Sequence, residues 1–265
     1  MRPLISLGRE MAFELVEYRE LLLRVVIRDL LLRYKQTLMG VGWALFMPLL
    51  NTIVFCVVFM RITTIETPVP YPLFAFCGLW VWSFFASALR FSVTSLTSNA
   101  NLVSKVYFPR EILPLSTVAV SFVDFAVGSA VLAALMAWYG LGVGGSLVWL
   151  PLVVLVHLVF TVAAALTLAM GNLFYRDVRY LFEILIAVWM FASPVVYPVD
   201  RVGGVLGMAL QLNPMTAIVD AYRAVLLLNS PPPASLGIAA VVAFAALAAG
   251  WALFHRLEFE FAENI

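Results

Sequence analysis

The run of residues 148–174, VWLPLVVLVHLVFTVAAALTLAMGNLF, contains no Asp, Glu, Lys or Arg. A helix needs about 20 apolar residues to cross the hydrocarbon core of a bilayer, and this run exceeds that length. The apolar helices of soluble cores are usually shorter. We therefore expect residues 148–174 to form a membrane-spanning α-helix.

The composition extends this expectation to the whole chain. Of its 265 residues, 64% are hydrophobic and only 12% are charged, and the mean hydropathy is +1.02. Soluble domains contain roughly 25% charged residues, so a soluble domain of this size could not bury so much apolar surface. The sequence predicts an integral membrane protein, and its formal net charge of +1 gives no indication of a nucleic-acid partner.

Six apolar runs predict an all-α integral membrane protein with six transmembrane helices. The runs are 38–60, 72–95, 113–139, 148–174, 180–198 and 234–255. The fifth run ends in SPVVYP (193–198), where the prolines predict a broken helix. Residues 199–233 are too interrupted by Gly and Pro for a span and too apolar for an exposed loop. We expect re-entrant helices there, before the last span, because irregular backbone at membrane depth needs protein or a water-filled cavity around it.

The N-terminal segment predicts a helix of a different kind. In residues 13–35, FELVEYRELLLRVVIRDLLLRYK, charged side chains recur every three or four positions and apolar ones fill the rest. Such an amphipathic helix lies in the plane of the membrane interface. Two pairs within it, Glu20–Arg24 and Asp29–Arg33, have the i,i+4 spacing that favours ion pairs.

We expect a single domain over residues 1–265, since no repeat or soluble module interrupts the chain. It divides into an interface helix over 1–36, a six-span membrane domain over 37–256 and a tail over 257–265. Most basic residues fall on one side of the predicted spans: Arg2, Arg9, Arg19, Arg24, Arg28, Arg33, Lys35, Lys105, Arg110, Arg176, Arg179 and Arg256. Because cytoplasmic loops carry the excess of Lys and Arg, both termini are expected in the cytoplasm.

The sequence contains no group of residues that would indicate an enzyme or an ATP-hydrolysing motor. It has no GxxxxGK[ST] phosphate loop, no HExxH and no GxSxG. The two histidines, His157 and His255, fall in different predicted spans, and Cys56 and Cys77 lie in apolar runs without a CxxC spacing. We expect a non-catalytic membrane subunit that binds no metal or cofactor, with any ATP hydrolysis on another polypeptide.

Asp124 is the carboxylate that lies deepest in a predicted span. Proton relays use chains of ionisable groups across the membrane, and one carboxylate does not make such a chain. We expect Asp124 to form a hydrogen bond with a neighbouring helix. An ion-coupled carrier that uses Asp124 is the alternative.

A charged and aromatic segment, VSKVYFPREILPL (103–115), lies between the second and third predicted spans. Its prolines can fix the ends of a short helix. Its aromatic pair, Tyr107 and Phe108, suits pockets on a partner protein, and its charged side chains can fix the register of the contact. The alternative is an ordinary cytoplasmic loop whose aromatic rings lie among the lipid headgroups.

Six short blocks support a resemblance to a known family. They are Arg28-Asp29-Leu30 with Arg33-Tyr34-Lys35, Gly40 to Pro48, Lys105 to Pro114, Asn172 to Val178, Ser193 to Tyr197, and Leu212-Asn213-Pro214. With these blocks the chain resembles, over nearly its whole length, the transmembrane (permease) subunit of a type-2 ABC exporter of the O-antigen, capsule and teichoic acid branch. It has Met39-Gly40 where such proteins often carry Leu-Gly; Met is close to Leu in volume, and Gly40 still allows a kink.

The resemblance implies a multi-pass protein of the bacterial inner membrane that works as a homodimer with two copies of an ABC nucleotide-binding subunit. That partner would carry the ATP and Mg. A coupling helix near residues 100–112 would dock on it. The residues assigned to this contact are Lys105, Tyr107, Phe108, Pro109, Arg110 and Glu111, with Arg176 and Asp177 in a second, weaker contact.

The resemblance also implies a lipid-diphosphate-linked glycan as the substrate. Cations at the cytoplasmic entrance would hold the diphosphate, and the candidates are Arg28, Arg33 and Lys35, with Gly40 at the turn. The same residues suit anionic lipid headgroups.

Aromatic faces could contact the sugar rings as they pass. The candidates for the pore and its outer gate are Trp80, Trp82, Phe84, Phe85, Pro194, Tyr197 and Pro198. The alternative places these aromatic residues in the interfacial belt. A type-2 exporter of small molecules or drugs is the alternative function within the same superfamily.

Overall fold

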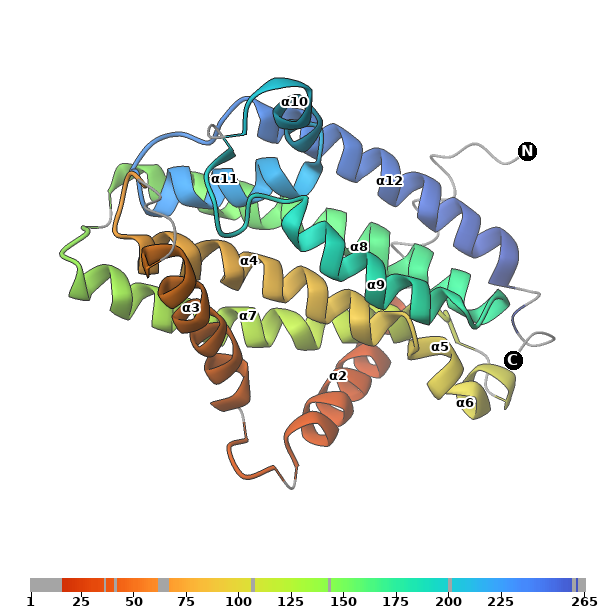
Figure 1. Ribbon diagram of the computed structural model, residues 1–265. Helices are drawn as coiled ribbons and strands as arrows, with labels where there is room; N and C mark the ends of the chain where they lie inside the picture. Colours follow the sequence, from red (N-terminus) through yellow and green to blue (C-terminus); the bar gives the residue numbers. More distant parts are fainter. Residues whose placement is uncertain are drawn as a thin grey trace.

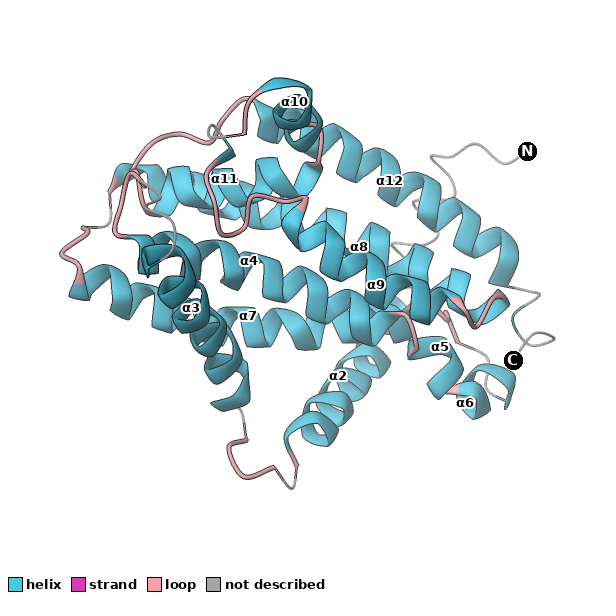
Figure 2. Ribbon diagram, in the orientation of Figure 1, coloured by secondary structure: helices cyan, strands magenta, loops and turns pink. Residues whose placement is uncertain are grey.

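The computed structural model describes residues 16–35, 37–40, 42–61, 67–105, 108–142, 144–199, 202–258 and 261. Every regular element in this part of the chain is helical, and it contains no strand (Figure 2). The elements are α2 (Arg19–Tyr34), α3 (Gly42–Arg61), α4 (Tyr71–Ser92), α5 (Ser95–Ser98), α6 (Ala100–Lys105), α7 (Ile112–Trp138), η1 (Gly145–Trp149), α8 (Leu150–Phe174), α9 (Val178–Phe191), α10 (Gly204–Gln211), α11 (Pro214–Leu226) and α12 (Ser235–Leu257). The predicted all-α fold is therefore confirmed.

Helices occupy all six runs that the sequence predicts as spans. Within the part of the chain that the structure describes, four segments are long and apolar enough to cross a membrane: α4, α7, the joined η1–α8 segment and α12. The apolar stretch of α3 is shorter, Leu45–Phe59, and α9 has 14 residues. Because α9 ends at Phe191, the fifth run is broken close to the predicted place.

The long helices lie side by side, with α4 in their midst (Figure 1). α4 packs against α3, α7, α8 and α11, and α12 packs against α8. Since its neighbours cover α4 on most sides, nearly all its residues are buried, as expected for a helix that is apolar around its whole circumference. On one side of the bundle α2 and α3 diverge as a V-shaped pair (Figure 1).

The outer helices keep apolar side chains on their outward faces. On α12, Ile238, Val241 and Phe244 are exposed at helical spacing. On α2, Val25 is buried while Leu23 and Ile27 are exposed. Exposed apolar faces of this kind are suited to lipid or to another apolar protein surface.

The ion pair expected between Asp29 and Arg33 within the N-terminal helix is wrong. Asp29 pairs with its neighbour Arg28 at 2.9 Å, and Arg33 pairs with Asp124 of α7 at 2.5 Å. α2 packs along α7, so a carboxylate of the neighbouring helix replaces the one on the same helix. Tertiary contact therefore overrides the local spacing.

The interval 199–233 contains two short helices, α10 and α11, instead of a long one. Asn213 caps α11 by accepting a hydrogen bond from the Met215 amide at 3.1 Å, and Pro214 occupies the first turn. The Asn213 side-chain amide also donates to the Ala192 carbonyl at 3.1 Å and to the Ser193 hydroxyl at 2.8 Å. One residue thus joins the start of α11 to the end of α9.

Candidate functional site

A groove of about 590 Å³ lies between α2, α3, α4 and α7. Polar and aromatic side chains share its wall. They include Arg33, Tyr34, Trp43, Asn51, Trp80, Trp82, Ser83, Phe84, Ser87, Arg90, Phe91, Ser121, Asp124 and Phe125. Cavities of this size that combine aromatic walls with a few polar groups are typical ligand sites.

The polar centre of the groove is a cluster of three side chains. Arg33 donates to Asp124 at 2.5 Å, and the Tyr34 hydroxyl donates to the other carboxylate oxygen. Burial, helped by the hydrogen bond to Asp124, raises the pKa of Tyr34 to about 12, so the phenol keeps its proton at physiological pH. The predicted hydrogen bond of Asp124 to a neighbouring helix is confirmed.

Arg33 is also positioned by an aromatic ring. Its guanidinium carbon lies 3.9 Å from the centroid of the Phe91 ring on α4, a cation–π contact. The side chains of Arg33 and Asp124 are only 16% and 18% exposed. The pair is held in place from two helices and shielded from bulk solvent, so its orientation is well defined.

The aromatic wall is part of the core. Trp80 stacks on Phe125 with ring centroids 4.0 Å apart, and its indole nitrogen donates to the Phe125 carbonyl at 2.8 Å. A Cβ added at Gly128 would lie 2.7 Å from the Trp80 ring, so only glycine fits beneath it. The predicted pore residues Trp80, Trp82 and Phe84 are buried, yet each lines the groove.

Phe85, the fourth predicted pore residue, does not line the groove. Its ring stacks on Phe160 of α8 at 5.5 Å and meets Trp189 of α9 edge-on at 5.2 Å. The opposite wall of the groove comes from α3, where Trp43 and Asn51 are exposed. The groove therefore has a rigid wall on α4 and α7 and an accessible wall on α3.

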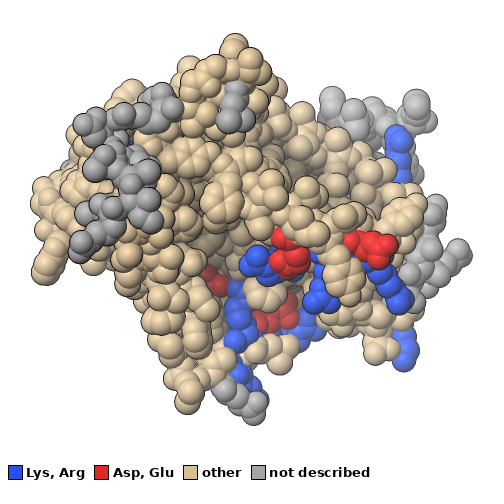
Figure 3. All heavy atoms as spheres, viewed as in Figure 1, with Lys and Arg blue, Asp and Glu red and all other residues tan. Residues whose placement is uncertain are grey.

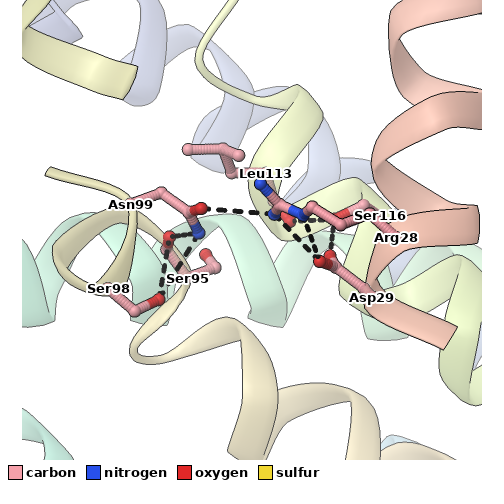
Figure 4. Close-up of polar contacts among 7 residues, drawn as sticks. All are labelled: Arg28, Asp29, Ser95, Ser98, Asn99, Leu113 and Ser116. Atoms are coloured by element: carbon pink, nitrogen blue, oxygen red, sulfur yellow. Dashed lines mark hydrogen bonds and ion pairs between the residues drawn. The ribbon is translucent and has the colours of Figure 1, made fainter. Parts of the chain in front are cut away.

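A second cavity, of about 300 Å³, lies next to the groove and shares Arg33 and Phe91 with it. Its other lining residues are rich in hydroxyl and amide groups: Asp29, Leu32, Thr94, Ser95, Ser98, Asn99, Leu113, Thr117 and Val120. Figure 4 shows its polar network. Arg28 donates to Asp29 at 2.9 Å and to Asn99 at 3.2 Å, and Ser116 donates to Asp29 at 3.1 Å.

The predicted entrance residues differ in whether a carboxylate already pairs with them. Arg28 and Arg33 each have a carboxylate partner, whereas Lys35 is exposed. Gly40 has a φ of +52°, which a non-glycine residue rarely adopts, so the kink between α2 and α3 uses its freedom. On the visible face, charged side chains gather around α2, α5 and α6 (Figure 3).

The predicted coupling segment near residues 100–112 contains the short helix α6, follows α5 and leads into α7. Lys105 is exposed, whereas Phe108, Pro109 and Glu111 are buried. Tyr107 lies outside the described residues. In this arrangement Phe108 packs inside the chain, so its docking on a partner stays a prediction.

Arg110 connects the coupling segment to the end of α12. Its guanidinium donates to the carbonyl oxygen of Glu258 and lies 5.8 Å from the ring centroid of Phe261. The Phe261 ring is fully buried against Phe254 and Phe174. Nothing in the sequence pattern indicated this contact between segments far apart along the chain.

The second predicted contact lies beside the first. Arg176 and Asp177 are exposed in the turn between α8 and α9. A cavity of about 550 Å³ joins this turn to α5 and α6, lined by Thr94, Thr97, Ala100, Asn172, Leu173, Arg176, Arg179 and Tyr180. The cavity reaches the predicted segment 100–112 at Ala100, whereas Lys105 and residues 108–111 do not line it, so a docking role for this surface stays a prediction.

The predicted outer gate is held by an arginine that the site prediction missed. Arg223 of α11 is buried and donates to the carbonyl oxygens of Pro194 at 2.7 Å and Val195 at 2.5 Å. Tyr197 and Pro198 are half-buried beside this turn, and the Tyr197 hydroxyl donates to the Phe191 carbonyl at 2.5 Å. The available signal was an arginine within the largely apolar run 214–228, three residues after Asp220, which lies 3.5 Å from it, because buried charges need partners.

No metal site is found among the described residues, where no three His, Cys, Asp or Glu side chains come together. His157 is buried against the rings of Phe84 and Tyr222. His255 lies 3.3 Å from Glu258 at the end of α12. The two histidines belong to separate surroundings, as their positions in the sequence predict.

Comparisons with known proteins agree with this architecture. The family described as "ABC-2 type transporter" matches residues 20–227. The O-antigen export system permease protein RfbA of Myxococcus xanthus is 31% identical over 255 residues, which cover 95% of this chain and 98% of that protein. Two proteins of the same name from Klebsiella pneumoniae are 27% and 26% identical, each over 96% of this chain.

Proposed function

The chain belongs to the ABC-2 type transporter family, and we propose that it is the permease subunit of an ATP-driven exporter of a lipid-linked polysaccharide of the O-antigen type. The observation that carries this proposal is the similarity, over nearly the full length, to three permeases of O-antigen export systems. The substrate would move from the cytoplasm across the inner membrane. Capsule and teichoic acid chains belong to the same chemical class of substrate.

The proposed topology has six crossing helices. α3 and α9 join the four long apolar segments as the first and fifth spans, α10 and α11 re-enter the membrane from the outer side, and α2 lies in the interface. The basic residues around α2, α5 and α6 support a cytoplasmic position for that end. Both termini would then be cytoplasmic.

In this proposal transport is driven by two separate ATPase subunits, which bind the ATP and Mg. The surface formed by α5, α6 and the turn at Arg176 and Asp177 is the proposed docking site, because it is continuous around one cavity. Two copies of the chain would form the path, with the outward apolar faces described above available for pairing and for lipid.

The proposed substrate path uses the groove. Lys35 is exposed at the end of α2, Arg28 lies outside the groove, Arg33 lines it, and the turn at Pro194, Tyr197 and Pro198 forms the outer gate. An ion-coupled carrier is less well supported, because Asp124 is already engaged by Arg33 and Tyr34. These two hydrogen bonds give Asp124 a structural role that requires no transported ion.

Reconstitution tests the proposal directly. The chain is expressed with the ATPase subunit from its own operon, purified from mild detergent and placed in proteoliposomes with the lipid-linked glycan of the source organism. We expect the two subunits to purify together and the glycan to move only when ATP is hydrolysed. Export without an ATPase, or a complex that moves no glycan, would contradict the proposal.

A matched pair of surface variants locates the docking site. Lys105→Glu reverses an exposed charge on α6, and Arg24→Glu reverses an exposed charge on α2. We expect the first to weaken recovery of the ATPase and the second to leave it unchanged, since charge complementarity governs such contacts. Equal recovery with both variants would place the docking site elsewhere.

A further inference from the structure

The charges around the groove nearly cancel, and this bears on which part of the substrate it recognises. Arg33 is paired with Asp124 at 2.5 Å. Arg90, the other arginine of the wall, is paired with Glu183 at 3.2 Å. A cation that already has a carboxylate within 4 Å attracts a further anion weakly, because the two fields oppose each other. A diphosphate would gain little from this site.

The cluster nevertheless has unused hydrogen-bonding capacity. A carboxylate accepts about four hydrogen bonds, and Asp124 accepts one at each oxygen from within the cluster. A guanidinium has five N–H donors, and Arg33 uses one of its nitrogens on Asp124. Donors and acceptors that lie side by side match a hydroxyl group, which both donates and accepts. A phosphate oxygen would instead face the lone pairs of Asp124.

The surrounding wall completes the match to a sugar ring. Trp43 on α3 is 39% exposed and supplies the accessible ring, whereas Trp80 and Trp82 are buried in the opposite wall of the groove. Aromatic rings offer flat apolar surfaces to the CH groups of a sugar. Asn51 adds an exposed amide, a donor and an acceptor on one side chain, from the accessible wall.

We propose that Arg33, Asp124 and Asn51 form a subsite that binds the hydroxyl groups of a sugar ring of the exported glycan, and not its diphosphate. Tyr34 positions Asp124 in this subsite, and the diphosphate is bound outside the groove. The inference rests on the proposed function and deepens it. It replaces the role that the family resemblance implies for Arg33, which is to bind the diphosphate.

Two lipids that differ only in the sugar separate these roles. The probes are the lipid-diphosphate-linked glycan purified from the source organism and undecaprenyl diphosphate without a sugar. The apparent Kd of each is taken from its effect on ATP hydrolysis by the complete complex in nanodiscs. For Arg33→Met we expect binding of the glycan-bearing lipid to weaken about 10-fold, the usual effect of losing a hydrogen-bonded polar contact. Binding of the sugar-free lipid should not weaken.

Two further variants protect the test against misfolding. Asn51→Ala changes an exposed side chain, so it should fold normally and still weaken only the glycan-bearing lipid. Arg28→Met removes a similar arginine, also paired with a carboxylate on α2, but outside the groove. It should leave the ratio of the two Kd values unchanged, because Arg28 lies away from the proposed sugar subsite. A loss of folded protein would also leave this ratio unchanged, so the ratio is the quantity to compare.

The possible results are distinct. If Arg33→Met weakens both lipids by the same factor, Arg33 binds the diphosphate and the inference is overturned. The same follows if Asn51→Ala leaves both Kd values unchanged, or if the wild type shows no preference for the glycan-bearing lipid. None of these results bears on the proposal of ATP-driven export, which is contradicted if the wild-type complex moves no glycan in proteoliposomes or moves it without the ATPase.

Discussion

Arg223 on α11 donates a hydrogen bond of 2.7 Å to the carbonyl oxygen of Pro194, 29 positions earlier in the chain. The same guanidinium donates to Val195 at 2.5 Å and lies 3.6 Å from the ring centroid of Phe74 on α4. One buried side chain therefore joins α11, the turn after α9 and the central helix. Among the described residues no backbone N–H donates to these two carbonyls, so the shape of the turn depends on Arg223.

Replacing Arg223 with Met should destabilise the protein strongly. Each buried carbonyl left without a donor costs about 1–3 kcal/mol, and the variant loses the donors of both Pro194 and Val195. We expect a clearly lower melting temperature of the purified protein in detergent, measured by tryptophan fluorescence. Arg179→Met, at an exposed position, is the control and should melt like the wild type. Equal melting of the two variants would show that the turn holds its shape without Arg223.

Gly78 gives an independent test of the same contact. A Cβ at this position would lie 2.6 Å from Nη2 of Arg223 and would also collide with the Val195 carbonyl oxygen. Gly78→Ala should therefore lower the melting temperature, because both obstacles are held in place. Gly237→Ala is the matched control on α12, where a Cβ meets no atom within 4 Å. There alanine should be neutral or stabilising, by up to about 1 kcal/mol. A harmless Gly78→Ala would mean that the turn can move away from α4.

The sequence predicted the helical fold and the positions of the helices well, because length and apolar composition decide them. The break after Phe191 was also predictable, since Ser193 and Pro194 interrupt an apolar run. The amphipathic spacing of Asp29 and Arg33 gave the wrong partner. An i,i+4 ion pair is worth only about 0.3–0.5 kcal/mol, so the packing of α2 on α7 easily replaces it.

The sequence indicated several residues of the site, but not which of them lie together in space. Arg33, Trp80 and Trp82 were chosen for separate roles, and the fold brings them to one groove. The contact of Arg110 with Phe261 could not be predicted, since nothing in residue spacing relates a loop to a terminus 150 positions away. Long-range pairing depends on how helices pack, and single-sequence patterns do not record it.

The pH dependence of stability should reveal the burial of Tyr34 and its hydrogen bond to Asp124. The pKa of Tyr34 is raised to about 12 in the folded protein, above the value of about 10 for an unfolded chain. The neutral phenol therefore stabilises the fold fully below about pH 10, and this contribution is lost as the pH rises towards 12. We expect the difference in melting temperature between wild type and Tyr34→Phe to be constant from pH 7 to 9 and to shrink above pH 10. A difference that does not change up to pH 11.5 would show that Tyr34 is not held against Asp124.

A variant of Arg110 can distinguish two roles of this side chain: docking on the ATPase, or joining the start of α7 to the end of α12. If its side chain docks on the ATPase, as the sequence pattern predicts, Arg110→Ala should lose the ATPase during purification. The structure instead directs the guanidinium to the Glu258 carbonyl and the Phe261 ring. We therefore expect Arg110→Ala to retain the ATPase and its ATP hydrolysis but to export less glycan per ATP, because α12 is no longer tied to the start of α7.

Two companion variants complete this test. Phe261→Ala removes the ring from the other side of the contact and should reproduce the loss of export per ATP. It should also destabilise the fold, since truncating a fully buried Phe costs about 3–5 kcal/mol. Arg256→Ala, an exposed change at the same end of α12, should behave like the wild type. Loss of the ATPase with Arg110→Ala but not with Phe261→Ala would instead assign Arg110 to the partner surface, with its contact to α12 formed only in the absence of the ATPase.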